Sequence, residues 1–236
     1  FDRNGAQIRE YAKGDPYLRD LRHTIGHVAA LTSACWSPED EDRFFTASED
    51  GCIRQWHIGY RAASEAVLRV RSRTPQRCLV TAVACLPNWL LAGAADGILR
   101  LYPLRTYSKA TPPPVNSVAE YQMHGRISII AVTKDKLAAR TVDGQVCVFE
   151  VHNSLFKLVN SWNDKDLASS FEEVSLCFLS QDSLFTGCRG GLAQLNLLNG
   201  TKTILPFPDE VASVAWNSST GQLACGHASG KISIFL

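Results

Sequence analysis

A short turn that ends in glycine recurs along the chain and constrains its fold more than any other feature. The five copies are Glu49-Asp50-Gly51, Ala95-Asp96-Gly97, Val142-Asp143-Gly144, Arg189-Gly190-Gly191 and Ala228-Ser229-Gly230. Their final glycines stand at 51, 97, 144, 191 and 230, so they are 46, 47, 47 and 39 residues apart. Glycine supplies the positive φ that such a hairpin turn requires. A near-constant period of this length indicates a chain built from repeated supersecondary units.

The clearest copy of the unit is residues 26–58. It contains, in order, Gly26-His27, an apolar strand at 28–36, an acidic turn with one proline at 37–42, a strand at 44–48, the tight turn at Gly51, and a strand at 52–58 that carries Trp56. A Gly-His start, two tight turns and a late tryptophan in this order resemble a WD40 repeat, which is one blade of a β-propeller. We therefore expect an all-β fold of the WD40 β-propeller class.

The resemblance implies a buried polar relay within this blade. In WD40 blades, a histidine, a hydroxyl at the end of the second strand, the turn aspartate and the tryptophan are joined by hydrogen bonds; here they would be His27, Ser48, Asp50 and Trp56. Buried polar groups are tolerated when their donors and acceptors are paired. We assign these residues a structural role, because a catalytic base at His27 would need an open cleft.

Five repeats are visible, at about 26–71, 79–123, 127–161, 174–205 and 211–236, and we expect them to form a single propeller domain over residues 1–236. The last repeat ends without an outer strand. Residues 1–25 are either the end of a preceding blade, to which FDRNG at 1–5 belongs, or the source of the closing strand of a five-bladed ring, at 7–13. The residues alone leave both alternatives open.

Composition excludes some classes of function. The chain has 236 residues, of which 45% are hydrophobic, and a formal net charge of +1. This is enough apolar material for a core, and the near-neutral charge gives no general attraction to nucleic acid or membranes. No apolar stretch reaches the roughly 18 residues of a membrane-spanning helix. We expect no membrane association.

The eight cysteines are expected to be structural. No Cys-x-x-Cys pair occurs, and Cys35, Cys85 and Cys177 fall at the same position of the first strand in their repeats. A free cysteine suits a buried site for a small apolar side chain. This usage predicts no metal site or cofactor and favours a reducing compartment, the nucleus or the cytosol.

No catalytic motif stands out. The sequence lacks a glycine-rich phosphate loop, a nucleophile elbow and a zinc-protease helix. We expect a protein that is not an enzyme and has no small-molecule substrate.

The strongest local charge is a group of arginines between the first and second repeats. Its members are Arg61, Arg69, Arg71, Arg73 and Arg77. One interpretation is contact with RNA phosphates or an acidic partner. The alternative is a solvated outer strand whose charges protect an exposed edge. The lack of interleaved aromatic residues favours this alternative. A further arginine, Arg105, is a separate candidate for partner contact.

Residues 8–58 resemble one family more closely than WD40 repeats in general. The matching residues are Lys13-Gly14-Asp15, Tyr17, Asp20, Thr24, Gly26-His27, Trp36-Ser37-Pro38, Phe45-Thr46, Asp50 and Ile53-Arg54-Gln55-Trp56. They are similar to the gastrulation-defective, or WD repeat-containing protein 70, family. The resemblance implies a seven-bladed ring with two further blades upstream, and a nuclear scaffold with no catalysis of its own.

The same resemblance implies two functions. The first is a non-catalytic adaptor that mediates protein–protein interactions in a nuclear complex, the spliceosome, with peripheral RNA contact at most. The alternative is a substrate receptor of a cullin–RING ubiquitin ligase in genome maintenance, including the DNA damage response. Ligase docking usually needs a Trp-Asp-x-Arg motif, and Tyr102-Pro103-Leu104-Arg105 keeps only its arginine. The expected location is the nucleus, with the cytoplasm as the alternative.

Overall fold

The computed structural model describes residues 9–18, 20–21, 23–59, 63–73, 78–108 and 111–235. Within this part of the chain there are 19 β-strands in five antiparallel sheets, and the helical structure is one 3-10 turn, η1 (Lys165–Leu167). No helix in these ranges has the length and hydropathy needed to cross a membrane. The all-β class predicted from the repeated turns is confirmed.

Each of the first four sheets has four strands that pair in sequence order. The first contains β1 (Leu31–Trp36), β2 (Arg43–Ser48), β3 (Cys52–His57) and β4 (Ala66–Arg69). The second contains β5 (Val80–Leu86), β6 (Trp89–Ala94), β7 (Ile98–Pro103) and β8 (Ala119–Gln122). The third contains β9 (Ile127–Val132), β10 (Lys136–Thr141), β11 (Val146–His152) and β12 (Leu155–Trp162).

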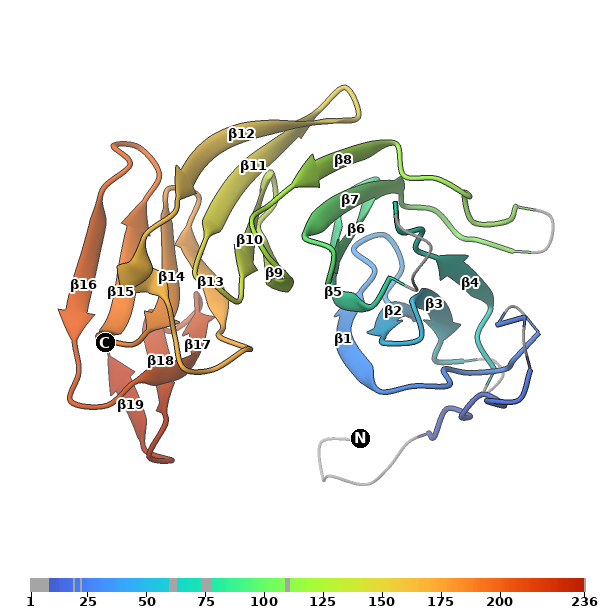
Figure 1. Cartoon of the computed structure of the whole chain (residues 1–236), viewed down its shortest axis with the longest axis horizontal. Coiled ribbons are helices and arrows are strands. Elements are labelled where there is room, and N and C mark those ends of the chain that lie inside the picture. Colours follow the sequence, from blue (N-terminus) through green and yellow to red (C-terminus); the bar gives the residue numbers. More distant parts are fainter. Residues whose placement is uncertain are drawn as a thin grey trace.

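The fourth and fifth sheets follow the same order. The fourth contains β13 (Leu176–Ser180), β14 (Ser183–Cys188), β15 (Gly191–Asn196) and β16 (Lys202–Pro206). The fifth has three strands, β17 (Val211–Asn217), β18 (Gln222–His227) and β19 (Ile232–Phe235). The first strands of successive sheets contact one another, and the sheets fan out from them in an open arc (Figure 1). This is the radial arrangement of propeller blades.

The core lies between neighbouring sheets. One apolar cluster joins Phe45 and Ile53 of the first sheet to Leu90 and Tyr102 of the second, and three further clusters join the later sheets in the same way. The inner strands are covered on both faces. Strands buried on both faces have near-continuous apolar sequences, as in Trp89–Ala94, and do not alternate.

The repeated turns have the predicted backbone conformation. The five glycines that end them all have positive φ, from 76° at Gly97 to 133° at Gly191. They connect the second strand of each sheet to the third, so the repeat period of the sequence is the period of the blades.

The segment at 7–13 does not act as a closing strand in its described part. Residues 9–13 form no strand, and the ring of Tyr11 packs against Phe44 and Trp56 of the first sheet, with both centroid distances 5.2 Å. Residues 1–8, which include FDRNG, lie outside the described residues. Aromatic packing therefore holds this segment on the first blade, at the opposite end of the arc from β19 (Figure 1).

Gly187 on β14 should be intolerant of any side chain. A Cβ atom there would overlap the backbone oxygen of Val211, where β14 meets β17 of the next blade. We expect Gly187→Ala to lower the free energy of unfolding by roughly 1–3 kcal/mol, because overpacking between sheets forces the backbone apart. Urea denaturation followed by tryptophan fluorescence measures this change.

Gly190→Ala is the matched control. The nearest atom to a Cβ at Gly190 is Ile204 Cγ2 at 3.8 Å, which is an ordinary contact. A change within about 0.5 kcal/mol is expected there. Equal effects of the two variants would contradict close packing between the fourth and fifth blades.

Candidate interaction surface

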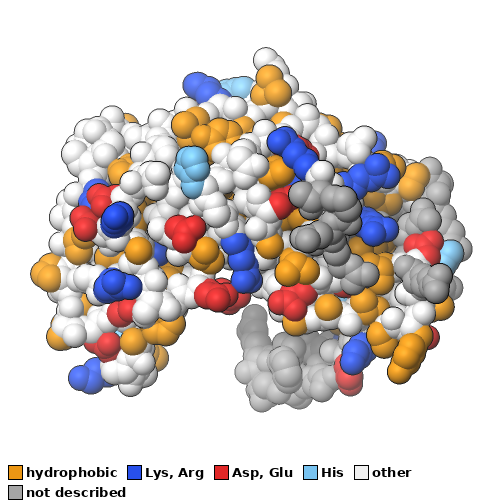
Figure 2. Space-filling model, viewed as in Figure 1, with side chains coloured by type: hydrophobic (Ala, Val, Ile, Leu, Met, Phe, Trp, Pro, Cys, Tyr) orange, Lys and Arg blue, Asp and Glu red, His pale blue; other side chains and the backbone are white. Residues whose placement is uncertain are grey.

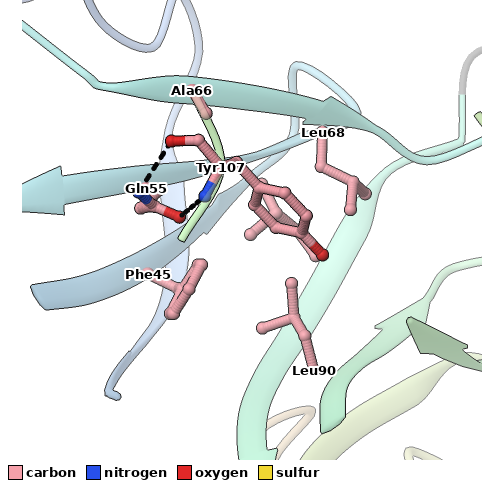
Figure 3. A pocket seen from close by; sticks show the side chains of 7 residues that line it. Phe45, Gln55, Ala66, Leu68, Leu90 and Tyr107 are labelled. Atoms are coloured by element: carbon pink, nitrogen blue, oxygen red, sulfur yellow. Dashed lines mark hydrogen bonds between the residues drawn. The ribbon is translucent and has the colours of Figure 1, made fainter. Parts of the chain in front are cut away.

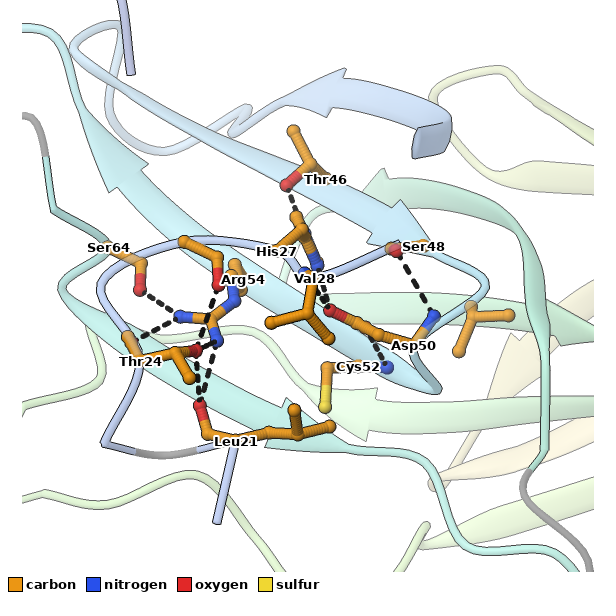
Figure 4. A network of polar contacts seen from close by, with 12 residues as sticks. Leu21, Thr24, His27, Val28, Thr46, Ser48, Asp50, Cys52, Arg54 and Ser64 are labelled. Atoms are coloured by element: carbon orange, nitrogen blue, oxygen red, sulfur yellow. Dashed lines mark hydrogen bonds and ion pairs between the residues drawn. The ribbon is translucent and has the colours of Figure 1, made fainter. Parts of the chain in front are cut away.

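His27, directly before the first blade, is the centre of a buried polar relay. Its side chain is about 5% exposed, with Nδ1 at 2.8 Å from Asp50 Oδ2 and Nε2 at 2.8 Å from Thr46 Oγ1 (Figure 4). Trp56 Nε1 donates to the same Thr46 oxygen at 2.7 Å. An ionised carboxylate only accepts hydrogen bonds, so the ring nitrogen that faces Asp50 carries the hydrogen. The relay joins β2 and β3 to the segment before β1.

The hydroxyl in this relay is Thr46, whereas the sequence analysis placed Ser48 there. Ser48 Oγ instead accepts a hydrogen bond from the backbone N–H of Asp50 at 3.1 Å. The two residues lie on the same face of β2, because side chains alternate along a strand. Thr46 is two pairs along from Phe44, which lies directly opposite Trp56, so the two side chains are on the same face of the sheet. Its hydroxyl therefore reaches both rings, while Ser48 lies at the turn.

Three arginines in the described part of the chain are fully buried, and their burial was not predicted from the sequence. Arg54, Arg100 and Arg140 are each at most 1% exposed. An arginine inside an otherwise apolar strand was the signal that could have revealed them. A buried charge is costly unless it is hydrogen-bonded, so each must have partners in the fold.

Those partners lie in different segments for each arginine. Arg54 donates to the backbone oxygens of Leu21 at 2.8 Å and Thr24 at 3.0 Å, which fixes the segment before β1 against β3 (Figure 4). Arg140 donates to the backbone oxygens of Leu167 at 2.7 Å and Gly187 at 2.8 Å, across to the fourth blade. Burial lowers the pKa of Arg140 to about 10, because the opposing charge interactions with Cys188 and Glu210 do not outweigh it.

In the second blade the turn aspartate has a different partner from that in the first. Arg100 Nη2 donates to Asp96 Oδ2 at 2.5 Å and Nη1 to Oδ1 at 3.1 Å. Burial lowers the pKa of Arg100, but hydrogen bonding to Asp96 outweighs it and raises the pKa above its usual value. The same turn position therefore pairs with a histidine in one blade and an arginine in the next.

The predicted arginine group is only partly brought together. Arg69 and Arg71 are exposed at the end of β4, and Arg73 donates to Glu120 Oε2 at 2.7 Å. Arg61 and Arg77 lie outside the described residues. Arg105 is exposed elsewhere, beside a cavity of about 120 Å³ that Glu39 and Asp40 also line.

Arg69 and Arg71 line a cavity of about 670 Å³ between β4 and the connection from β7 to β8. The rest of its lining is Asp20, Leu21, Cys52, Val67, Pro112, Pro113, Pro114 and Val115. A second cavity of about 270 Å³ shares Arg71 and Val115 and includes Arg100 and Glu120. We call these two adjoining cavities the arginine groove. Basic side chains gather on this side of the molecule (Figure 2).

Tyr107 fixes the connection that forms one wall of the groove. Its backbone N–H donates to Gln55 Oε1 at 3.1 Å, and its backbone oxygen accepts from Gln55 Nε2 at 3.3 Å. The ring enters the space between the first two blades beside Leu68 and Leu90 (Figure 3). The start of the β7–β8 connection is therefore held by buried contacts, and the groove is part of the fold.

The relay histidine and the cysteines are the residues that the sequence drew attention to as candidates for reactive chemistry. Both ring nitrogens of His27 have partners, so it has no free atom for proton transfer. The eight cysteines form no disulfide. Burial, followed by the charge of Asp96, raises the pKa of Cys78 to about 11, which keeps this thiol protonated near neutral pH. Across the described ranges, no three His, Cys, Asp or Glu side chains form a group suited to a metal ion.

Comparisons with solved structures decide the fold family. The β-propeller domain of Cps50 (Swd1) from Myceliophteria thermophila superposes with a TM-score of 0.72 at 18% identity, over 89% of this chain and 72% of that one. U3-55K gives a TM-score of 0.67 at 15% identity, over 89% of this chain and 62% of that one. The family model for the WD domain, G-beta repeat, matches residues 19–57. The chain has the WD40 β-propeller fold.

Curated relatives of this WD40 chain carry the family name that the first blade suggested. The gastrulation defective protein 1 homolog of Drosophila melanogaster is 27% identical over 98% of this chain, and WD repeat-containing protein 70 of Xenopus tropicalis is 26% identical over 100% of this chain. The resemblance is therefore confirmed across all five sheets. The chain spans 37% and 39% of the length of these two relatives.

The relay predicts unequal roles for the two hydroxyls of β2. Thr46→Val removes the acceptor of Trp56 and the partner of His27, so buried polar atoms lose their bonds, and we expect a loss of about 2–3 kcal/mol in unfolding free energy. Ser48→Ala removes one bond and should cost about 1 kcal/mol. Thr46→Ser keeps the hydroxyl and is the control. Urea denaturation that finds Ser48→Ala the more damaging would contradict this relay.

Asp50 should make the free energy of unfolding depend on pH in the acidic range. Burial raises the pKa of Asp50, but hydrogen bonding to His27 and the charge of His27, with the N–H groups of Val28 and Cys52, outweigh it, so the pKa is lowered. The ionised Asp50 carboxylate contributes fully to the free energy of unfolding above about pH 4, which is the usual pKa of aspartate in an unfolded chain. This contribution is lost as the pH falls through the lower pKa that Asp50 has in the folded state. We expect the stability difference between wild type and Asp50→Asn to shrink below about pH 4, measured by urea titrations from pH 7 to pH 3. A difference independent of pH would be the contrary result.

Proposed function

We propose that this chain is part of a non-catalytic scaffold in a nuclear ribonucleoprotein assembly, the spliceosome, and that the arginine groove is one of its docking sites. The observation that carries the proposal is the groove itself. It combines two exposed arginines with apolar walls from Leu21, Val67 and Pro112–Pro114. Such a lining suits an acidic protein segment, because cationic and apolar contacts are both available.

The lining favours protein over RNA as the direct partner. Tyr102 is the aromatic residue that lines the groove, and it is 1% exposed. Single-stranded RNA is usually held by bases stacked on exposed aromatic side chains. The proposed partner is therefore a protein subunit of the assembly, and any RNA contact is peripheral.

The spliceosome is proposed as the assembly because of the resemblance to the WD repeat-containing protein 70 family. The run from Lys13 to Trp56 and the relatives named WD repeat-containing protein 70 both support it. The role in splicing and the nuclear location are what that resemblance implies. Propellers commonly hold complexes together through their rims and loops, which supports a scaffold role.

One observation keeps the ligase receptor as a second candidate. Arg105 is exposed two residues after the end of β7, where a docking motif would place its arginine. Tyr102 is buried in the core and Pro103 replaces the acidic residue. If this function holds, the ligase's propeller adaptor co-purifies with the protein and is lost in Arg105→Ala.

The groove is tested by reversing its charge. Arg69→Glu combined with Arg71→Glu should reduce recovery of splicing proteins at least fivefold, because an acidic segment would then be repelled. The full-length protein is tagged in cells of its native source, purified and quantified by mass spectrometry. Lys134→Glu combined with Lys231→Glu is the matched control, since both lysines are exposed and far along the chain from the groove.

The partners recovered with wild type rank the two functions. Splicing proteins retained in the lysine control and depleted in the arginine variant support the proposal. Recovery mainly of ligase subunits supports the second candidate, and equal recovery with all three proteins contradicts a docking role for the groove.

A further inference from the structure

The segment at 168–175 crosses between blades. It follows η1, precedes β13 and contains no helix or strand, and we call it the crossing loop. Ser170, Glu172 and Glu173 are exposed on it, while Ser169 is half-buried. An exposed irregular segment can open locally without unfolding a sheet.

Glu210, directly before β17 of the fifth blade, holds the centre of the crossing loop. Its carboxylate accepts from Ser170 N at 2.7 Å, from Ser170 Oγ at 2.5 Å and from Ser169 Oγ. Burial raises the pKa of Glu210, but the hydrogen bonds from Ser169 and Ser170 and the charge of Arg189 outweigh it and lower the pKa. Glu210 therefore holds the crossing loop as an ionised carboxylate, which requires hydrogen-bond donors around it.

The crossing loop is also tied to two other blades. Glu172 pairs with Arg126 Nη1 at 3.0 Å, and Arg126 directly precedes β9 of the third blade. The backbone oxygen of Ala168 accepts from Arg189 N at 3.0 Å, in the turn after β14 of the fourth blade. One short segment thus connects the third, fourth and fifth blades through polar contacts at the surface.

The sequence around Ser170 is typical of the substrates of kinases that select acidic residues after the modified hydroxyl. Glu172 and Glu173 follow the hydroxyl by two and three positions, and both are exposed. Kinases of this class recognise such carboxylates with basic side chains. Ser37 is also followed by acidic residues, but it begins the hairpin between β1 and β2, where its N–H donates to Arg43 O and its Oγ accepts from Glu39 N. In the crossing loop, the backbone hydrogen bonds to the other blades lie at the two ends, at Ala168 and Ser175, and not at Ser170.

We propose that Ser170 is a phosphorylation site for an acid-directed serine/threonine kinase, and that the modification releases the crossing loop from Glu210. In the reaction, Ser170 Oγ attacks the γ-phosphorus of ATP. The new O–P bond forms as the bond to the β-phosphate oxygen breaks, ADP leaves, and the hydroxyl proton passes to the base of the kinase. This inference is independent of the scaffold's partners.

The release follows from charge. Phosphate adds about −2 at neutral pH and removes the hydroxyl hydrogen that Ser170 donates. The Glu210 carboxylate, 2.5 Å from Ser170 Oγ, then faces an anion where it had a donor. Arg126 and Arg189, which interact with Glu172 and Glu210, become the favoured partners of the phosphate.

The site is tested with purified protein, casein kinase 2 and ATP, with phosphopeptide mass spectrometry to locate the phosphate. We expect incorporation mainly at Ser170, at least tenfold less total incorporation in Ser170→Ala, and about tenfold less in Glu173→Gln. Ser37→Ala should match wild type. Modification confined to other residues, or unchanged incorporation in Ser170→Ala, would overturn the proposal.

The release is tested separately by hydrogen–deuterium exchange on phosphorylated and unmodified protein. Amides of the crossing loop, including that of Ser170, should exchange at least tenfold faster after phosphorylation, while β10 should be unchanged. Ser170→Ala removes one hydrogen bond without adding charge, so its effect should be smaller. Equal exchange in the phosphorylated and unmodified crossing loop would overturn the release.

Discussion

Every sheet in this protein has two apolar faces, and the contact of those faces with neighbouring sheets is the constraint on which the structure depends. Leu90, Phe149 and Leu195 come from three different sheets, and none is exposed to solvent. Apolar side chains on both faces of a sheet are covered when the sheet stands between two others, as the second, third and fourth sheets do. The radial arrangement of blades follows from that requirement. It also explains why the connections, rather than the strands, provide most of the exposed polar surface.

Polar groups enter these apolar layers only where the fold supplies partners for them. In the first blade, Asp50 is paired by His27, and in the second, Asp96 is paired by Arg100. Arg140 is held by the backbone oxygens of Leu167 and of Gly187 in the next blade. In the second blade, a buried arginine therefore takes the place that a histidine has in the first.

The two surfaces with a proposed role lie at different parts of the arc. The arginine groove belongs to the first two blades and is shaped by a connection that Tyr107 and Gln55 anchor. The crossing loop joins the last three blades through carboxylate contacts at the surface. Docking at one place and a change of charge at the other can operate without disturbing the core, because neither depends on moving a strand. A scaffold gains from such separation, since partner binding and modification act on independent contacts.

The sequence by itself determined the fold class, the repeat period and the turns at Gly51, Gly97, Gly144, Gly191 and Gly230, because the turns and the repeat motif are local patterns that can be compared with WD40 repeats. Three of the four relay residues, His27, Asp50 and Trp56, were predictable for the same reason. Only the tertiary structure decided that Thr46 and not Ser48 completes the relay, since this depends on the register of β2 against β3. It also decided that residues 9–13 lie on the first blade and that Pro112–Pro114 face Arg69 and Arg71. The backbone oxygens that accept hydrogen bonds from Arg54 and Arg140 lie 27 to 47 residues away along the chain, and no local pattern encodes such distances.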